Sequence, residues 1–284
     1  MGIAALALVS AAWGWSLADP EIGRARALYQ QTQYRQALQI LEPAQPRTAA
    51  IHELAGQCYY MLEDYKQASE AFQKAVAADG RNSVYWNWLG KAYGMRAENA
   101  FPLVAPSYAS KARQYFEKAV ELDPQNLEAV DDLFEYYLQA PGFLGGGQDK
   151  AAQLSERIRD RAPAKYHSLQ ARLAEKQKKL PIAEQHLREA IEAAPAEPGR
   201  LIDLARFLAR QRRYSDSDAA FDRAAELAPD SAGLKFQRAR TYVDANRNLD
   251  LARKLLQEYL SSSLTPDDPP RADAQKLLQK IGKG

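Results

Sequence analysis

The sequence predicts an all-α fold, a right-handed superhelical solenoid of about seven helix–turn–helix repeats with a C-terminal capping helix. Two series of residues with a common period of about 34 residues predict it. The first series places a small residue in the second helix of each repeat, at Ala37, Ala68, Ala112, Ala151, Ala183, Ser217 and Ala252. The second series marks the ends of repeats, at Gly80, Pro124, Pro163, Pro195 and Pro229. Between these positions apolar residues recur at three- and four-residue intervals, which is typical of amphipathic helices.

The small residues have a direct physical role. Two helices approach closely only where side chains are short, so Gly56 and Gly90 in two first helices indicate contact points, as do Ala171 and Ala205 in later repeats. A proline at the end of a repeat has no N–H group and cannot continue a helix. One helix pair cannot bury its own apolar face, so neighbouring pairs are expected to stack into an array.

The repeats follow one another along most of the chain. We expect them at residues 19–44, 49–82, 83–126, 127–163, 164–195, 198–229 and 232–260, within an array that spans residues 19–263. The segment SSSLTPDDPP then interrupts the periodicity. Residues 264–284 are expected to form a linker and a final amphipathic helix, Arg271–Ile281, that covers the apolar end of the stack.

Two stretches carry the signature of a known repeat family. They are the W-x2-LG-x2-Y opening formed by Trp86, Leu89, Gly90 and Tyr93, and the second-helix residues Tyr65, Ala68, Phe72 and Ala75. On these residues the chain resembles the tetratricopeptide repeat family over about residues 20–260. The resemblance implies a non-catalytic scaffold whose first helices line a concave groove that binds another protein or a peptide segment.

Carried over to this chain, the resemblance assigns one stripe of each first helix to the groove. The candidate partner-binding residues on these stripes are Asn87, Lys91, Asp131, Glu135, Lys165, Arg172, Lys176, Arg206, Arg210 and Arg240. The groove would be acidic at the fourth repeat and basic from the fifth to the seventh, which favours an acidic segment or C-terminus as partner. The alternative interpretation is that these are ordinary solubilising charges. Asn87 and Lys91 stand in reverse order to the carboxylate-clamp set of the family, so specificity for chaperone tails is not expected.

Two insertions interrupt adjacent repeats at the same turn, between the first and the second helix. They cover residues 96–108 and 140–148, and their apolar residues are Phe101, Leu103 and Val104 in one and Phe143 and Leu144 in the other. Either the two loops pack on each other as a small apolar cluster, or they form a partner-binding lip at the edge of the groove. A third possibility is a small-ligand or enzymatic pocket between them.

The N-terminal residues 2–18 carry no charge and end in Ser16-Leu17-Ala18, which fits the cleavage site of a secretory signal. We therefore expect an exported scaffold of the bacterial cell envelope, located in the periplasm. The alternative is an uncleaved anchor in the inner membrane, which would make the chain a tethered envelope assembly factor. In either case no membrane contact is expected outside this segment.

Little in the sequence suggests other chemistry. The net charge of +2 predicts no general attraction to nucleic acid. The histidines His52, His167 and His186 lack zinc-ligand spacing, and no nucleophile motif occurs, so no catalytic, metal or cofactor residues and no enzymatic activity are expected. The run 145–147 of three glycines lacks the following Lys-Ser/Thr of a phosphate-binding loop and predicts a flexible turn. Cys58 is the single cysteine, so no intramolecular disulfide can form.

Overall fold

The computed structural model describes residues 18–45 and 47–282, and within these ranges the chain is an all-helical solenoid without β-strands. Residues 2–18, which are predicted to be a secretory signal or a membrane anchor, lie outside the described residues except for Ala18. Among the described helices, none is both long enough and apolar enough to cross a bilayer.

Fourteen of the fifteen α-helices in the described ranges form seven consecutive pairs, as the periodicity predicts. The first helices are α1 (Ala18–Gln30), α3 (Ala49–Met61), α5 (Ser83–Glu98), α7 (Leu127–Gln139), α9 (Pro163–Lys176), α11 (Pro198–Arg210) and α13 (Ala232–Asp244). The second helices are α2 (Tyr34–Leu41), α4 (Tyr65–Ala78), α6 (Ala105–Leu122), α8 (Gln148–Glu156), α10 (Leu180–Ala193), α12 (Tyr214–Leu227) and α14 (Leu249–Ser261). A short 3-10 helix, η1 (Gly142–Leu144), precedes α8, and α15 (Arg271–Gly282) ends the array.

The predicted small residues lie where the two helices of each pair meet. All seven members of the series, from Ala37 to Ala252, have an exposed fraction of 0%. A Cβ atom on Gly56 would lie 2.7 Å from the ring of Phe72, and one on Gly90 would lie 2.6 Å from the ring of Phe116. Glycine at these two positions therefore permits a helix-to-ring contact that any larger residue would displace.

The pairs without an insertion share one turn geometry. Each turn has a residue in a left-handed backbone conformation, with φ between 49° and 63°, at Thr32, Glu63, Lys178, Arg212 and Asn246, and the last turn has a second one at Asn248. This conformation reverses the chain direction between the first and the second helix within three or four residues. The two pairs with insertions, α5–α6 and α7–α8, use longer connections instead.

The structure shifts two boundaries that the sequence predicts. Pro163, expected to close the fourth repeat, is the first residue of α9, a position that tolerates proline because its N–H group would have no helical partner. The insertion expected at residues 96–108 is mostly helical, because α5 extends to Glu98 and α6 begins at Ala105, so only residues 99–104 form the loop.

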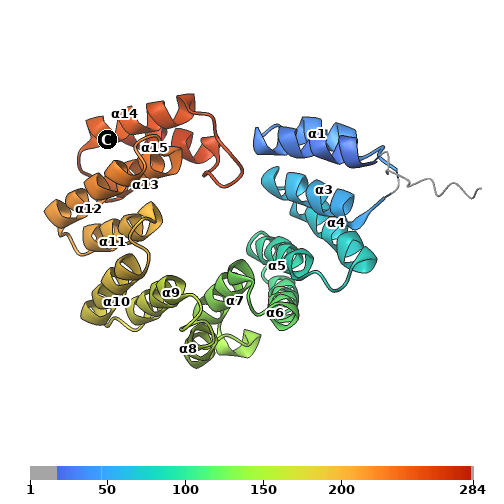
Figure 1. Cartoon of the computed structure of the whole chain (residues 1–284), viewed down its shortest axis with the longest axis horizontal. Helices are drawn as coiled ribbons and strands as arrows, with labels where there is room; N and C mark the ends of the chain where they lie inside the picture. The colour runs from blue at the N-terminus through green and yellow to red at the C-terminus, as the bar shows by residue number, and fades with distance from the viewer. Residues whose placement is uncertain (1–17, 46, 283–284) are drawn as a thin grey trace, which may run out of the picture.

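The pairs are arranged in a ring that makes nearly one turn, with first helices on the inner side and second helices on the outer side (Figure 1). The linker 262–270 lies beside the first repeats. The two segments line one cavity of about 200 Å³, with Tyr34 and Met61 on one side and Leu264 and Pro269 on the other. Helix α15 packs against α13 and α14 and buries Ala274 and Ile281. It therefore covers the end of the stack as predicted.

Candidate partner-binding groove

The inner side of the ring is formed by the first helices, which contact one another directly. Helix α3 packs against both α1 and α5, α7 against both α5 and α9, and α11 against α13. Residues at equivalent positions of successive first helices therefore lie next to each other across the groove wall, one repeat apart (Figure 1).

In the middle of the groove the predicted acidic and basic residues bind each other. Lys165 Nζ lies 2.9 Å from Asp131 Oδ2, and Arg172 Nη1 lies 2.5 Å from Asp131 Oδ1. The other guanidinium nitrogen of Arg172 pairs with Glu135. Burial alone would raise the pKa of Asp131, but Lys165 and Arg172 together hold that pKa below its usual value. These four residues form a bridge between α7 and α9 rather than two separate binding surfaces.

A second bridge connects α5 with α7. Lys91 pairs with Glu128 and also lies 3.4 Å from Asp132. Asn87 donates a hydrogen bond of 2.8 Å to Asp132 and is only 2% exposed. A partner in the groove would therefore contact Asp132 rather than the buried Asn87. Burial raises the pKa of Asp132 and outweighs the opposing effects of Lys91 and Asn87.

Two further predicted cations have intramolecular partners one repeat away. Lys176 donates a hydrogen bond of 2.9 Å to the side-chain oxygen of Gln139. Arg210 lies 2.6 Å from Glu175. The expected basic inner face of the fifth to seventh repeats is therefore partly neutralised by acidic and polar side chains of the neighbouring helices.

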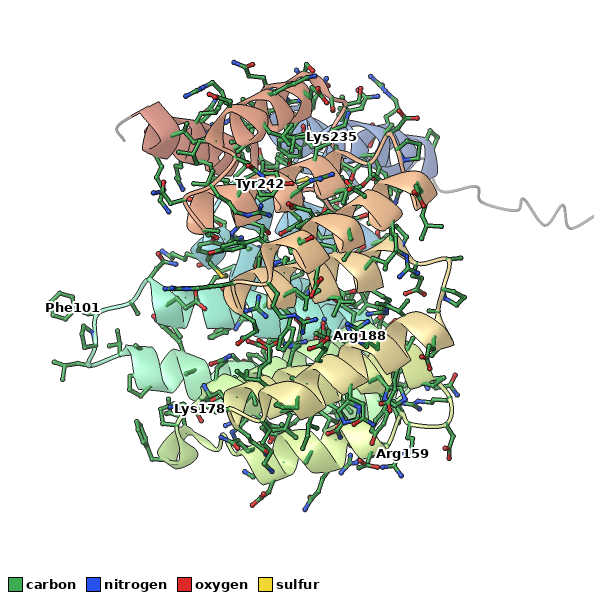
Figure 2. The ribbon with its side chains drawn as sticks, turned by 90° about the vertical axis from the view of Figure 1, so that its left-hand side faces the viewer. Phe101, Arg159, Lys178, Arg188, Lys235 and Tyr242 are labelled. Atoms are coloured by element: carbon green, nitrogen blue, oxygen red, sulfur yellow. The ribbon has the colours of Figure 1, made fainter. Side chains whose placement is uncertain are left out.

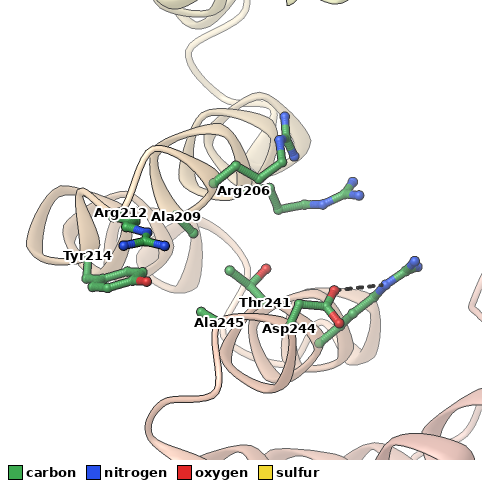
Figure 3. A pocket seen from close by; sticks show the side chains of 9 residues that line it. Arg206, Ala209, Arg212, Tyr214, Thr241, Asp244 and Ala245 are labelled. Atoms are coloured by element: carbon green, nitrogen blue, oxygen red, sulfur yellow. Dashed lines mark ion pairs between the residues drawn. The ribbon is translucent and has the colours of Figure 1, made fainter.

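The excess positive charge is concentrated between α11 and α13. A cavity of about 440 Å³ is lined there by Arg206, Arg210, Arg212 and Arg240, together with the single acidic residue Asp244. Figure 3 shows Arg206 on one wall, Arg212 beside Tyr214, and Asp244 on the opposite wall in its ion pair with Arg240. At 3.8 Å this pair is long, so it leaves most of the guanidinium's hydrogen-bonding capacity unused.

Arg206 has no ion-pair partner among the described residues of the cavity. Among the described residues, no carboxylate oxygen lies within 4.0 Å of its guanidinium nitrogens. Burial lowers the pKa of Arg206, and the positive charges of Arg210 and Arg240 lower it further against the opposing effect of Asp203. An anion placed in this cavity would relieve the repulsion between the crowded cations.

The two inserted loops project on the same side of the molecule, where Figure 2 labels Phe101 at the outer end of the α5–α6 loop. Phe101 is 78% exposed, Leu103 is 90% exposed and Phe143 is 81% exposed. The interpretation that these loops bury their apolar side chains against each other is therefore wrong. The second loop is held against the preceding repeat instead, since η1 packs against α6.

Leu144 differs from the other loop residues because it faces inward. It lines a cavity of about 450 Å³ together with Met95, Phe116, Tyr136 and Pro141. The three-glycine turn behind it is structural. Gly145 has φ of +86°, and a Cβ on Gly146 would lie 1.9 Å from the carbonyl oxygen of Ala140.

Sequence reasoning did not single out Arg212, Tyr214 or Asp244 as groove residues. Arg212 lies in the turn after α11, outside the helical stripe that the periodicity defines. The signal that was present is the run Arg210-Gln211-Arg212-Arg213, an unusually basic turn at the end of a first helix.

Family models match three parts of the chain. Models described as tetratricopeptide repeat match residues 108–126 and 202–269, and a model described as anaphase-promoting complex, cyclosome, subunit 3 matches residues 22–75. No curated protein matches the chain in sequence.

Several solved structures have a similar fold. A tetratricopeptide repeat protein from Parabacteroides merdae is 14% identical, with a TM-score of 0.59, over 93% of this chain and 98% of that one. A thermophilic TPR protein of Thermus thermophilus is 20% identical, with a TM-score of 0.54, over 66% and 97%. A chain of the APC/C hetero-tetramer Cut9–Hcn1 is 15% identical, with a TM-score of 0.52, over 94% and 49%. At these identities the likeness concerns the fold alone.

Proposed function

This chain is a tetratricopeptide repeat protein, and on that premise we propose that it is a non-catalytic scaffold that binds an acidic peptide segment of a partner protein in its concave groove. The single observation that carries the proposal is the arginine cavity between α11 and α13. It combines four guanidinium groups with one acidic side chain, and most of its lining residues lie on the first helices α11 and α13.

The chemistry of recognition follows from the guanidinium group. A carboxylate accepts two parallel hydrogen bonds from one arginine, and such charge-assisted bonds are stronger than neutral ones. Arg206 and Arg240 project from neighbouring first helices and line the same cavity, so one glutamate- or aspartate-rich segment could contact both. Binding would need no chemical step, since a preformed cavity only exchanges water for the partner's oxygens.

The paired residues in the middle of the groove have a different role in this proposal. Lys165, Arg172, Asp131 and Glu135 cross-link α7 and α9, so they hold the groove wall rather than supply free charge. Reversing the charge of Arg172 would disturb the wall itself. The direct contribution to binding is therefore assigned to Arg206 and Arg240.

The test uses a defined probe, a labelled glutamate-rich peptide, with its glutamine-substituted copy as the neutral comparison. The full chain is expected to bind the glutamate peptide with an affinity that falls as salt rises. The double variant Arg206→Glu, Arg240→Glu should bind at least about tenfold more weakly, since each charge-assisted hydrogen bond contributes roughly 1.5–3 kcal/mol.

The matched control is Arg223→Glu, which makes the same charge change at an exposed position of the second helix α12. Its affinity for the glutamate peptide should stay close to that of the unchanged protein. Equal weakening by Arg223→Glu would mean that only net charge matters. Equal binding of the glutamine peptide would contradict a carboxylate-directed groove.

A second candidate function rests on the apolar cavity beside the inserted loops. Met95, Phe116, Tyr136 and Leu144 line the apolar part of a space of about 450 Å³, which suits a small, largely apolar ligand or an apolar side chain of a partner. The charged residues Lys91, Glu98, Asp132 and Glu135 complete its lining. A thermal-shift screen should then find small apolar molecules that raise Tm, and Met95→Trp, which fills the cavity, should abolish the shift. A shift that persists in Met95→Trp would exclude this cavity as the site.

We further propose that the chain is exported to the periplasm, on the basis of the uncharged segment 2–18. Cell fractionation and intact-mass measurement of the protein from its host test this directly. A mature protein beginning near Asp19 in the soluble envelope fraction is expected. A full-length protein in the membrane fraction would instead support the tethered assembly factor.

A further inference from the structure

Three side chains in the fifth repeat converge although the sequence separates them. His167 lies on α9, and His186 and Glu189 lie on α10. The Nδ1 atoms of the two histidines are 3.1 Å apart. Oε2 of Glu189 lies 3.0 Å from Nδ1 of His167 and 2.9 Å from Nδ1 of His186. We propose that these three atoms bind a divalent transition-metal ion of the zinc class, which links the two helices of this repeat.

The hydrogen-bonding capacity of these three atoms favours a cation between them. A carboxylate only accepts hydrogen bonds, and a neutral imidazole carries one proton on either of its two nitrogens. If one Nδ1 carries its proton, the other Nδ1 faces the carboxylate oxygen as a second acceptor. If both Nδ1 atoms carry protons, two N–H groups face each other at 3.1 Å. No protonation state makes all three contacts favourable, whereas a metal ion accepts a lone pair from each atom.

The dimensions of the triangle fit such an ion. Zinc binds histidine nitrogen at about 2.0–2.1 Å and carboxylate oxygen at about 2.0–2.2 Å. With sides of 2.9 to 3.1 Å, an ion at these distances lies about 1.1 Å above the plane of the three atoms, with ligand–metal–ligand angles of about 95°. Opening each side by about 0.3 Å gives the tetrahedral angle. Ordinary side-chain adjustment is enough to provide either geometry.

A neighbouring side chain orients the carboxylate. Gln185 Nε2 donates a hydrogen bond of 2.9 Å to Oε1 of Glu189 and so leaves Oε2 directed at the two histidines. Supporting hydrogen bonds of this kind are a regular feature of metal sites. Imidazole and carboxylate together favour zinc, copper, nickel and cobalt over magnesium and calcium, which prefer oxygen ligands alone.

The surroundings also suit metal binding. All three side chains are half-buried, which leaves one side open for an ion to enter and for water to complete its coordination.

The site lies away from the groove. His167 follows Lys165 by two residues, which corresponds to about 200° around a helix, whereas Arg172 returns to the face of Lys165. A bound ion would thus stabilise the α9–α10 pair without competing with a partner in the groove. The metal site does not depend on the proposed function.

The test measures zinc binding to the full chain without a histidine tag, by equilibrium dialysis, and follows cobalt substitution by visible absorption. One ion per chain is expected. His186→Ala and Glu189→Gln should each remove binding, and Gln185→Ala should weaken it about tenfold, as supporting residues do. The matched control is His52→Ala on α3, which removes the one remaining histidine and should leave the affinity unchanged.

A measurement on the unchanged protein complements the variants. Nitrogen NMR of the histidine rings should show that zinc shifts Nδ1 of His167 and His186 and leaves His52 unaffected. Zinc binding that persists in the double variant His167→Ala, His186→Ala would overturn the proposal. So would the absence of zinc binding to the unchanged protein up to millimolar concentration.

Discussion

Ser217 is the one polar member of the buried small-residue series, and its replacement by alanine is expected to stabilise the protein. Its side chain has an exposed fraction of 0%, and its hydroxyl oxygen has no hydrogen-bond partner among the described residues. The other six members of the series are alanine, so the site already has the shape that suits a methyl group.

The magnitude follows from two contributions. A buried hydroxyl without a partner costs about 1–3 kcal/mol, and alanine favours the helix over serine by up to roughly 0.7 kcal/mol. Loss of contacts made by the oxygen offsets part of this gain. We expect Ser217→Ala to raise the free energy of unfolding by about 1–2 kcal/mol, which raises Tm by roughly 2–8 °C in a chain of this size.

Two matched serines provide the control. Ser69 and Ser155 are also completely buried in second helices, but their hydroxyls are satisfied. Ser69 donates to the carbonyl of Lys66 and accepts from Arg96, and Ser155 donates to Ala152 and accepts from Gln170. Alanine at either position should lower stability by about 1–2 kcal/mol.

The assay is urea unfolding followed by circular dichroism at 222 nm, with thermal melting as a second measure. The sign of the change separates the three variants, since only Ser217→Ala should move the midpoint upward. A loss of stability in Ser217→Ala equal to that of the two controls would refute the reasoning.

Three further results are expected. Gly90→Ala should destabilise the third repeat by about 1–3 kcal/mol, because its Cβ would lie 2.6 Å from the ring of Phe116, and urea unfolding measures this. Burial would raise the pKa of Asp218, but its hydrogen bonds, chiefly from Arg247, lower that pKa. The ionised Asp218 therefore stabilises the fold above about pH 4, and this stabilisation is lost as pH falls through the folded-state pKa. Asp218→Asn should therefore cost about 1–3 kcal/mol at pH 7 and little at pH 2, and a constant difference across this range would contradict the assignment. Burial raises the pKa of Cys58 to about 12, so a thiol reagent at pH 8 should modify it only after unfolding, and rapid labelling of the folded protein would show that the side chain is accessible.

The repeat architecture could be predicted because each of its determinants is local and recurs. A small residue at the helix contact and a turn every 34 residues or so need no knowledge of distant parts of the chain. The seven buried positions and the final helix over Arg271–Ile281 confirm this. Pro163 and the ends of the α5–α6 loop were misplaced by a few residues, because proline suits the first turn of a helix and the inserted segment is itself helical.

The candidate site could be predicted only in part. The helical stripe places Arg206, Arg210 and Arg240 on the inner face, because their spacing sets the face of each helix, and all three line one cavity. Their part in partner binding stays a prediction. It does not reveal that Lys165 and Arg172 are bound to Asp131, since that contact depends on how far one repeat is rotated against the next. The same holds for His167 and His186, which lie 19 residues apart on two helices.

By itself, the sequence determined the helical repeats, their number and the small residues at their contacts, because one-dimensional periodicity is a direct record of which face of a helix is buried. Only the tertiary structure decided which charges remain available in the groove and which side chains form the histidine–glutamate triangle. Those properties depend on distances of a few ångströms between residues of different helices, and the rotation between stacked helices sets such distances without leaving a period in the sequence.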